Sequence, residues 1–470
     1  MGDIALTLLA LGLPWVAGAG VVVALLPARS RGTALLAAGA GLVLGAALAG
    51  IVMRLGAGLT PLGGATVTAC VLVALTIAAA VLRLRQDRAA AAVTRRFERP
   101  VGFWTLAGLG TVGVIVALNG YWMIGEIIQR PLLGWDAWKV WAVRPQVWFA
   151  VSPAVEFVDV PAWLAANDPG VHTVPGHHYP ELLGRFQLWH FALLDRWDPA
   201  LGHLVWAGAW AALIVGCLGL LRLAGATWSV AATVALLLAL APFPATHGAL
   251  PGYMDLWIAA QLLFATGFTV TWLRTGRTGP LLLALGFAAA LALTKVEGVV
   301  WALILAACAA LGLLSDRARL VALATGTGLL LLWFALGGFE LSLFGQPFVL
   351  RPDLIDLPGL GRAELVFENR LGFFAGALFM YPNWHVLGAL LALAVPLALL
   401  AAAPSPTRGF ARGFVMAALG FLFVLFNFTE AGYWAEDLTA SNRLTLHVLP
   451  AFLWLVAALY VEGEAPTHSA

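Results

Sequence analysis

The chain has 470 residues, of which 61% are hydrophobic and 11% are charged, and its mean hydropathy is +0.92. A soluble domain usually carries about a quarter charged residues, so this composition excludes a single soluble domain and predicts a polytopic membrane protein. The net charge of +2 is spread without a basic face, which argues against a nucleic-acid partner. Cys70, Cys217 and Cys308 all fall in apolar segments, so neither a disulfide framework nor a zinc site is indicated.

Residues 1–100 are predicted to form three accessory transmembrane helices, at 4–26, 33–52 and 65–82. Each run is close to the roughly 20 residues that a helix needs to cross the hydrocarbon core. The first run lacks the basic start and the cleavage site of a signal peptide, so it is interpreted as a membrane helix. A group of arginines follows the third run, and the positive-inside rule places it in the cytoplasm. Its members are Arg83, Arg85, Arg88, Arg95, Arg96 and Arg99.

Residues 101–337 are predicted to form the main membrane module. Its first span, 103–124, leads into an outer loop at 126–199 that is broken into short pieces by prolines and holds two interfacial helices, at 136–149 and 181–194. Further spans are expected at 201–221, 228–243, 254–272, 281–293, 299–314 and 320–336.

A second outer loop, 338–385, and a C-terminal segment, 386–470, complete the predicted architecture. The last three spans are expected at 386–403, 414–428 and 444–460. The fold class is therefore an all-α bundle of about 13 transmembrane helices, with the N-terminus outside and the C-terminus inside. All but five of the 24 acidic residues then fall outside, so we expect binding or catalysis at the outer face.

The stretch LGWDAWKVWAVRPQVWF, residues 133–149, carries the first candidate catalytic residue, Asp136. Lys139 follows three positions later and shares a helical face with it, and the spacing of Trp138 and Trp141 keeps these rings together. Such a tryptophan-rich, amphipathic segment is typical of a helix that lies flat at the membrane surface. The alternative interpretation is that Asp136 only caps an interfacial helix.

Two later motifs place charges at the ends of predicted membrane helices. Asp255, in PGYMDLW, opens one helix, where an acid also gains from the helix dipole without any catalytic role. Lys295 and Glu297, in TKVEG, lie between two apolar runs. Charges at membrane depth are costly unless they are paired or face a wet cavity, so both are candidate functional residues. The structural alternative is a mutual ion pair at a helix break.

Arg443 and His447, in SNRLTLHVLP, are four residues apart at the start of the last span and therefore share a helical face. A guanidinium and an imidazole in this arrangement can hold a phosphate, the former through a planar fork of N–H groups. The alternative is an ordinary cationic anchor at the membrane interface.

The run VHTVPGHHYPE supplies three further candidate substrate-binding residues, His178, Tyr179 and Glu181. A divalent metal is conceivable here but is not favoured, because the adjacent His177 and His178 do not match a common ligand spacing. No residue is therefore assigned as a metal ligand.

Taken in this order, the motifs resemble those of the GT-C superfamily of integral membrane glycosyltransferases, over about residues 102–450. WDAWKVW in a long outer loop looks like the catalytic loop of that family. YPELL, GYMDLW, LTKVEG and NRLTLHVLP are similar to segments of its bacterial members, which are mannosyltransferase-like and lipopolysaccharide-core sugar-transferase-like proteins. The chain departs from the family pattern in two ways: three spans precede the one that leads to the loop, and Asp136 has no second acid beside it.

The resemblance implies a polyprenyl-phosphate sugar as donor and a glycan, lipid or protein as acceptor. It also implies that Asp136 is the catalytic acid of the first outer loop and that Asp255 is a second acid near the sugar. Lys295, Arg443 and His447 match cations that hold the lipid phosphate. No cofactor is implied with certainty. The abundance of Ala, Gly, Leu and Arg suggests a bacterial source, so we expect a multi-pass protein of the cytoplasmic (inner) membrane whose active site faces the periplasm.

With these parts, Asp136 is expected to act as the general base on an acceptor hydroxyl, with inversion at the anomeric carbon. Lys295 and Arg443 would offset the charge that develops on the departing phosphate, while Trp138 and Trp141 would stack on sugars or grip the isoprenoid. Glu297 and Lys139 are supporting candidates. Three alternatives stay open: an O-antigen ligase or polymerase, a secondary transporter, and a non-enzymatic scaffold. Substrate-dependent release of polyprenyl phosphate separates the enzymes from the transporter and the scaffold.

Overall fold

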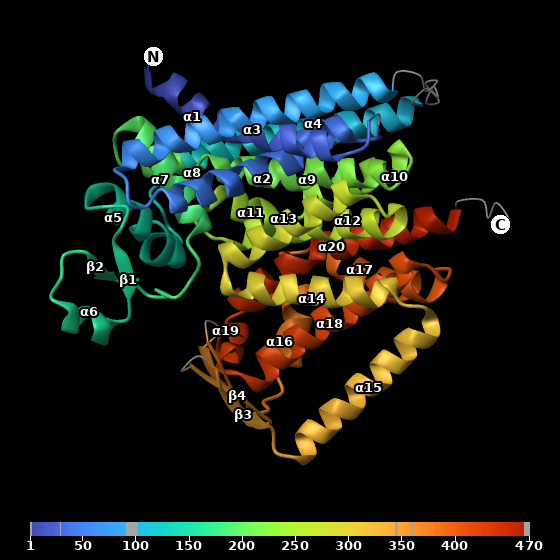
Figure 1. Ribbon diagram of the computed structural model, residues 1–470. Coiled ribbons are helices and arrows are strands. Elements are labelled where there is room, and N and C mark those ends of the chain that lie inside the picture. The colour runs from blue at the N-terminus through green and yellow to red at the C-terminus, as the bar shows by residue number, and fades with distance from the viewer. Residues whose placement is uncertain (1, 29, 91–101, 344–345, 359–360, 465–470) are drawn as a thin grey trace.

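The computed structural model describes residues 2–28, 30–90, 102–343, 346–358 and 361–464. The long helices run roughly side by side, and both long loops lie at one end of the bundle (Figure 1). Helix α1 begins at this end, and α20 finishes at the opposite end. Below, the end that carries the two loops is called the loop end.

Ten helices within the described residues are long and apolar enough to cross a membrane, and the count is eleven when one bent pair is included. The chain is therefore a polytopic, predominantly helical membrane protein, as its composition predicts. The ten are α1 (Gly2–Leu25), α2 (Thr33–Leu55), α3 (Pro61–Ala90), α4 (Phe103–Gln129), α8 with α9 (Pro199–His203 and Val205–Leu223), α12 (Asp255–Thr275), α14 (Val296–Leu313), α15 (Asp316–Ala335), α18 (Pro406–Phe428) and α20 (Thr439–Glu464).

The remaining predicted spans are helical but shorter, so the total of thirteen crossings stays a prediction. These helices are α10 (Trp228–Leu240), α13 (Thr278–Thr294) and α17 (Val386–Ala401). Helix α10 is followed at an angle of 59° by α11 (Pro242–Ala249). The bend occurs where Pro242 begins α11, because proline has no N–H to continue the hydrogen bonds of α10.

The three N-terminal helices pack directly on the rest of the bundle. Gly18 of α1 lies so close to Gly41 and Gly45 of α2 that a Cβ atom on it would meet backbone atoms at 2.0 to 2.8 Å. Helix α7 (Leu182–Leu194) lies against α1, α2 and α3. Arg83, Arg85 and Arg88 lie in the last part of α3, whereas Arg95, Arg96 and Arg99 are outside the described residues.

Helix α7 was predicted to be interfacial, and its surroundings differ from that expectation. Nearly every residue in it is buried, including Arg185 and Gln187. The Trp189 indole N–H donates to the carbonyl oxygen of Ala10 at 2.8 Å, which joins α7 to α1. The helix is enclosed by α1, α2, α3, α5 (Val143–Ala150) and α8, and its position at the membrane interface stays a prediction.

The first long loop contains short elements: a π-helical turn η1 (Ala137–Trp141), α5 (Val143–Ala150), α6 (Val160–Ala166), and the parallel strands β1 (Glu156–Val158) and β2 (Val171–Thr173). Two buried arginines hold this loop together. The guanidinium of Arg144 donates to the carbonyl oxygens of Tyr179 and Gly176, and Arg185 donates to that of Pro153 at 2.7 Å. The predicted interfacial helix at 136–149 is therefore two short pieces.

The second long loop departs from the predicted all-α class, because it forms an antiparallel four-stranded sheet. Its strands pair in sequence order: β3 (Phe339–Leu343), β4 (Gln346–Arg351), β5 (Leu354–Leu357) and β6 (Gly361–Glu364). The short helices α16 (Leu371–Ala375), η2 (Gly376–Met380), η3 (Glu430–Gly432) and α19 (Tyr433–Glu436) complete the described elements. The sequence does alternate along 339–343, which is the signal for a strand.

Candidate active site

Three separate segments meet at the carboxylate of Asp255, the first residue of α12. Arg443 Nε donates to Asp255 Oδ2 at 2.9 Å, and Lys295 Nζ donates to Asp255 Oδ1 at 3.0 Å. His447 Nε2 contacts the same Oδ1 atom at 3.0 Å. The Asp255 side chain is fully buried, with 0% of its surface exposed. The structure therefore brings the candidates Asp255, Lys295, Arg443 and His447 into one cluster.

A tight turn between two helices positions Lys295. Helix α13 ends at Thr294 and α14 begins at Val296, so Lys295 alone, in an extended conformation, connects them. Gly298 permits the close approach, since a Cβ atom there would lie 1.9 Å from the carbonyl oxygen of Leu291. The turn directs the Lys295 ammonium to two acids, Asp255 at 3.0 Å and Glu297 Oε1 at 2.9 Å.

Asp136 joins the cluster from the first long loop. Its Oδ2 atom lies 2.7 Å from Arg443 Nη2, so one guanidinium binds Asp136 and Asp255 at the same time. Asp136 directly precedes η1 but accepts no capping hydrogen bond from that helix. Its side chain is 26% exposed, in contrast to the buried Asp255. The capping interpretation therefore lacks its hydrogen bond, and the contact with Arg443 takes its place.

We call Asp136, Asp255, Lys295, Glu297 and Arg443 the ionic cluster. Its charges are three carboxylates and two permanent cations. Separating ions from water is costly, and a buried pair repays the cost only when its geometry is good and its hydrogen bonds are satisfied. Here each cation contacts two carboxylates, so the charges are paired, while Glu297 Oε2 is buried without a hydrogen-bond partner among the described residues.

Two aromatic residues that the sequence interpretation missed support the cluster. The Tyr253 ring lies 4.8 Å from the guanidinium carbon of Arg443, and Trp206 fixes the Tyr253 backbone by donating to its carbonyl oxygen at 2.8 Å. The indole of Trp301 donates to His447 Nδ1 at 3.1 Å. Tyr253 lies in the noted PGYMDLW motif, whereas no local signal distinguishes Trp301 from other tryptophans of apolar helices.

Among the predicted supporting residues, Tyr179 and Trp141 lie beside the ionic cluster. Their rings are stacked at 5.1 Å. Burial is the main cause that raises the pKa of Tyr179, and the carboxylates of Glu297 and Asp136 also raise it. This dependence on both acids shows that the phenol faces the cluster.

The other supporting candidates make different contacts. The Lys139 ammonium lies 4.8 Å from the ring centre of Trp138, and both side chains are exposed. His178 lies beside His177, at 5.3 Å between ring centres, and is only partly shielded from solvent. Glu181 binds Arg185 at 3.0 Å and so belongs to the anchoring of the first loop. In the part of the chain that the structure describes, no three His, Cys, Asp or Glu side chains are grouped as metal ligands.

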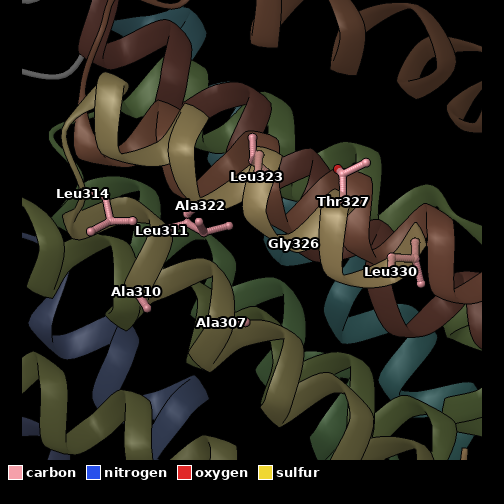
Figure 2. A pocket seen from close by; sticks show the side chains of 9 residues that line it. All are labelled: Ala307, Ala310, Leu311, Leu314, Ala322, Leu323, Gly326, Thr327 and Leu330. Atoms are coloured by element: carbon pink, nitrogen blue, oxygen red, sulfur yellow. The ribbon is translucent and has the colours of Figure 1, made fainter. Parts of the chain in front are cut away.

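A cavity of about 530 Å³ lies between α14 and α15, away from the ionic cluster (Figure 2). Thr327 supplies its one polar side chain, and apolar residues or glycine form the rest of the lining. Helix α15 has no buried residue and stands apart from the other helices (Figure 1). The cavity therefore has the character of space between two lipid-exposed helices and lacks groups for polar chemistry.

Comparison of the chain with protein-family models, with curated proteins and with solved structures gives no match in any of the three. The function is therefore argued below from the ionic cluster and the sequence resemblance.

Proposed function

We propose that this protein is a membrane glycosyltransferase of the GT-C type, which transfers a sugar from a polyprenyl-phosphate donor to an acceptor hydroxyl. The observation that supports it most is the shared contact of Arg443 with Asp136 and Asp255. An acid of the first long loop thereby meets cations at the ends of membrane helices. A water-soluble acceptor and a lipid-borne phosphate can both reach such a position.

Asp136 is the general base of the proposed reaction, and Asp255 orients the cations. Asp136 is partly exposed and keeps Oδ1 without a partner among the contacts of the described residues. Asp255 is buried, and both of its oxygens already accept hydrogen bonds. A base needs to reach the proton that it removes, so the exposed carboxylate is the better candidate.

Lys295 and Arg443 bind the phosphate of the donor. A guanidinium has five N–H donors, and Arg443 uses its Nε–H and one Nη2–H in the described contacts. An ammonium has three donors, and Lys295 uses two of them. Each cation thus keeps donors for a phosphate while its carboxylates hold it in place. Donors that are fixed before the reaction stabilise developing charge without a cost of reorganisation.

In the proposed step, the acceptor oxygen attacks the anomeric carbon as its proton passes to Asp136. The bond between that carbon and the phosphate oxygen breaks, and the polyprenyl phosphate leaves with the electron pair. A single displacement of this kind inverts the configuration. The stacked Trp141 and Tyr179 offer an aromatic face to the sugar.

The proposed setting is the cytoplasmic membrane of a bacterium, with the loop end of the bundle in the periplasm. Nucleotide sugars are not present in the periplasm, so the sugar donor has to reach the site attached to a membrane lipid. The acceptor belongs to one of three classes, a glycan, a lipid or a protein.

The test measures the release of polyprenyl phosphate from polyprenyl-phosphate sugars by the purified full chain and by Asp136→Asn. Loss of one well-placed base typically lowers the rate about 10²-fold to 10⁴-fold, and we expect a fall of that order. Asp159→Asn is the matched control, because Asp159 lies in the same loop and only caps α6, which asparagine does equally well. Full turnover in a folded Asp136→Asn variant excludes Asp136 as the base. Sugar uptake into vesicles without release of polyprenyl phosphate identifies a transporter instead.

A further inference from the structure

His447 of α20 is fully buried, and both of its ring nitrogens have partners. Nε2 lies 3.0 Å from Asp255 Oδ1, and Nδ1 lies 3.1 Å from the indole nitrogen of Trp301. Trp301, on α14, is also fully buried, and its ring packs edge-on against Phe421 of α18 at 5.0 Å. These contacts form a chain of hydrogen bonds that runs from Trp301 through His447 to Asp255.

The chemistry of the two partners fixes the protonation of the ring. An indole nitrogen can only donate a hydrogen bond, so His447 Nδ1 has to present a lone pair. An ionised carboxylate can only accept, so the hydrogen of His447 is on Nε2. The imidazole is then neutral, because its cation would carry a hydrogen on each nitrogen.

We propose that Trp301 is a positioning residue that locks His447 in the neutral Nε2–H form. His447 then gives Asp255 a directed hydrogen bond without adding a positive charge. This inference concerns the side chains alone and holds whatever reaction the protein performs.

The surroundings explain why a lock is needed. The charged and titratable groups around His447 are Asp255 of α12, Lys295 of the turn before α14, Glu297 of α14 and His247 of α11, and Arg443 lies one helical turn before it on α20. Asp255 and Glu297 favour a second proton on the imidazole, whereas burial and the Lys295 cation oppose it, and the hydrogen bond from Trp301 adds to this opposition by occupying Nδ1. An additional cation at His447 would compete with Lys295 and Arg443 for Asp255, and their positions would loosen.

The direct test is nitrogen NMR of the full chain with labelled histidine, because imidazole nitrogens with and without a hydrogen have well-separated shifts. His447→Gln assigns the signal. In the wild type we expect the neutral Nε2–H pattern to persist across the pH range in which free histidine titrates. In Trp301→Phe we expect Nε2 to keep its hydrogen, because Asp255 still accepts it, and the doubly protonated form to appear as the pH falls through that range.

The matched control is Trp454→Phe. Trp454 is a fully buried tryptophan of α20 whose indole nitrogen has no hydrogen-bond partner among the described residues, so this variant loses the same ring volume without breaking a described bond. The His447 signal is expected to stay unchanged in the control. An unchanged signal in Trp301→Phe as well, or an equal change in both variants, overturns the proposal.

Substitutions of His447 provide a second test, which does not depend on the folding of Trp301→Phe. Glutamine can donate at one end to Asp255 and accept at the other from Trp301, but it cannot become charged. We expect both variants to lose polyprenyl-phosphate-sugar turnover, and His447→Leu to lose about fivefold more than His447→Gln, the weight of one typical hydrogen bond. Equal loss in the two variants contradicts the role of the hydrogen-bond chain. If the proposed function is wrong, the wild type shows no release of polyprenyl phosphate. The NMR experiment then still tests the protonation of His447, because it does not depend on turnover.

Discussion

Arg443 Nη2 lies 2.7 Å from Asp136 Oδ2, although the first residue belongs to the last helix of the chain and the second to the first long loop. This ion pair closes the loop over the start of α20. Through Nε the same guanidinium also reaches Asp255 at 2.9 Å, so a single side chain connects an exposed carboxylate to a buried one. The stability of the site and the placement of the loop therefore depend on one residue.

Arg443→Gln is expected to lower the free energy of unfolding by about 3 kcal/mol, because Asp255 remains buried with one cation fewer. Adding Asp255→Asn is expected to restore part of this loss, since the uncompensated charge disappears. Thermal unfolding of the purified protein measures both effects. Arg196→Gln is the control: Arg196 pairs with Asp3 and Asp198 on the surface, where ion pairs contribute little, so its stability should stay close to that of the wild type. If the stability losses of Arg443→Gln and Asp255→Asn simply add in the double variant, the two side chains do not stabilise each other as proposed.

Gly134→Ala is expected to displace Tyr253 from beneath Arg443. A Cβ atom at position 134 would lie 2.3 Å from the Tyr253 ring, which is far inside van der Waals contact. Overpacking of this kind costs about 1 to 3 kcal/mol. The combination with Tyr253→Ala removes the clash and should recover stability relative to Gly134→Ala. Gly120→Ala serves as the control in differential scanning measurements, because nothing lies within 4 Å of a Cβ atom there. A Gly134→Ala variant that is as stable as the wild type would show that the Tyr253 ring has room to move.

Arg370→Met is expected to release the second long loop from the bundle. The buried Arg370 side chain binds Glu368 and Glu436 and donates to the carbonyl oxygen of Phe426. Its loss removes both ion pairs and leaves the Phe426 carbonyl oxygen without this donor, although Glu368 and Glu436, which are 55% and 43% exposed, can be hydrated instead. Limited proteolysis should then cleave within residues 338–370 faster than in the wild type.

Arg362→Met is the matched control for that experiment. Arg362 lies in the same loop, its side chain is 63% exposed, and its ion pair with Glu364 is long, at 3.9 Å. Exposed pairs of this kind contribute little, so the cleavage rate should stay close to that of the wild type. Equal acceleration in both variants would mean that the loop is not anchored through Arg370.

The pKa of His178 should lie below its ordinary value of 6.5, chiefly because of burial and secondly because of the neighbouring His177. Between the lowered pKa and 6.5 the unfolded chain binds more protons than the folded one, so stability falls as the pH drops below about 6.5. His177→Gln should move the pKa of His178 upward while leaving it below 6.5, since burial remains. Proton NMR titration of the ring measures this. A pKa of His178 that does not respond to the substitution would contradict the contribution of His177.

Composition and periodicity determined the membrane class and the position of nearly every long helix. These properties are local: a run of about 20 apolar residues is helical in a bilayer whatever surrounds it, because its backbone has to satisfy its own hydrogen bonds. The candidates Asp136, Asp255, Lys295 and Arg443 were also accessible from sequence, since charges beside apolar runs are conspicuous. The first strand of the sheet, at 339–343, was accessible as well through its alternation, whereas the three strands after it carry no such pattern.

Only the tertiary structure decided which of these charges meet. That Arg443 holds two carboxylates, that Lys295 reaches Asp255, and that Trp301 contacts His447 all depend on segments that are distant in the chain. The same holds for α7, whose sequence is amphipathic but whose surface is covered by α1 and α2. The energy of an ion pair or a hydrogen bond depends on the distance between two groups and on what shields them from water. Neither quantity is encoded in the residues near one position, so the sequence supplied the charged groups and the packing of the bundle assembled them.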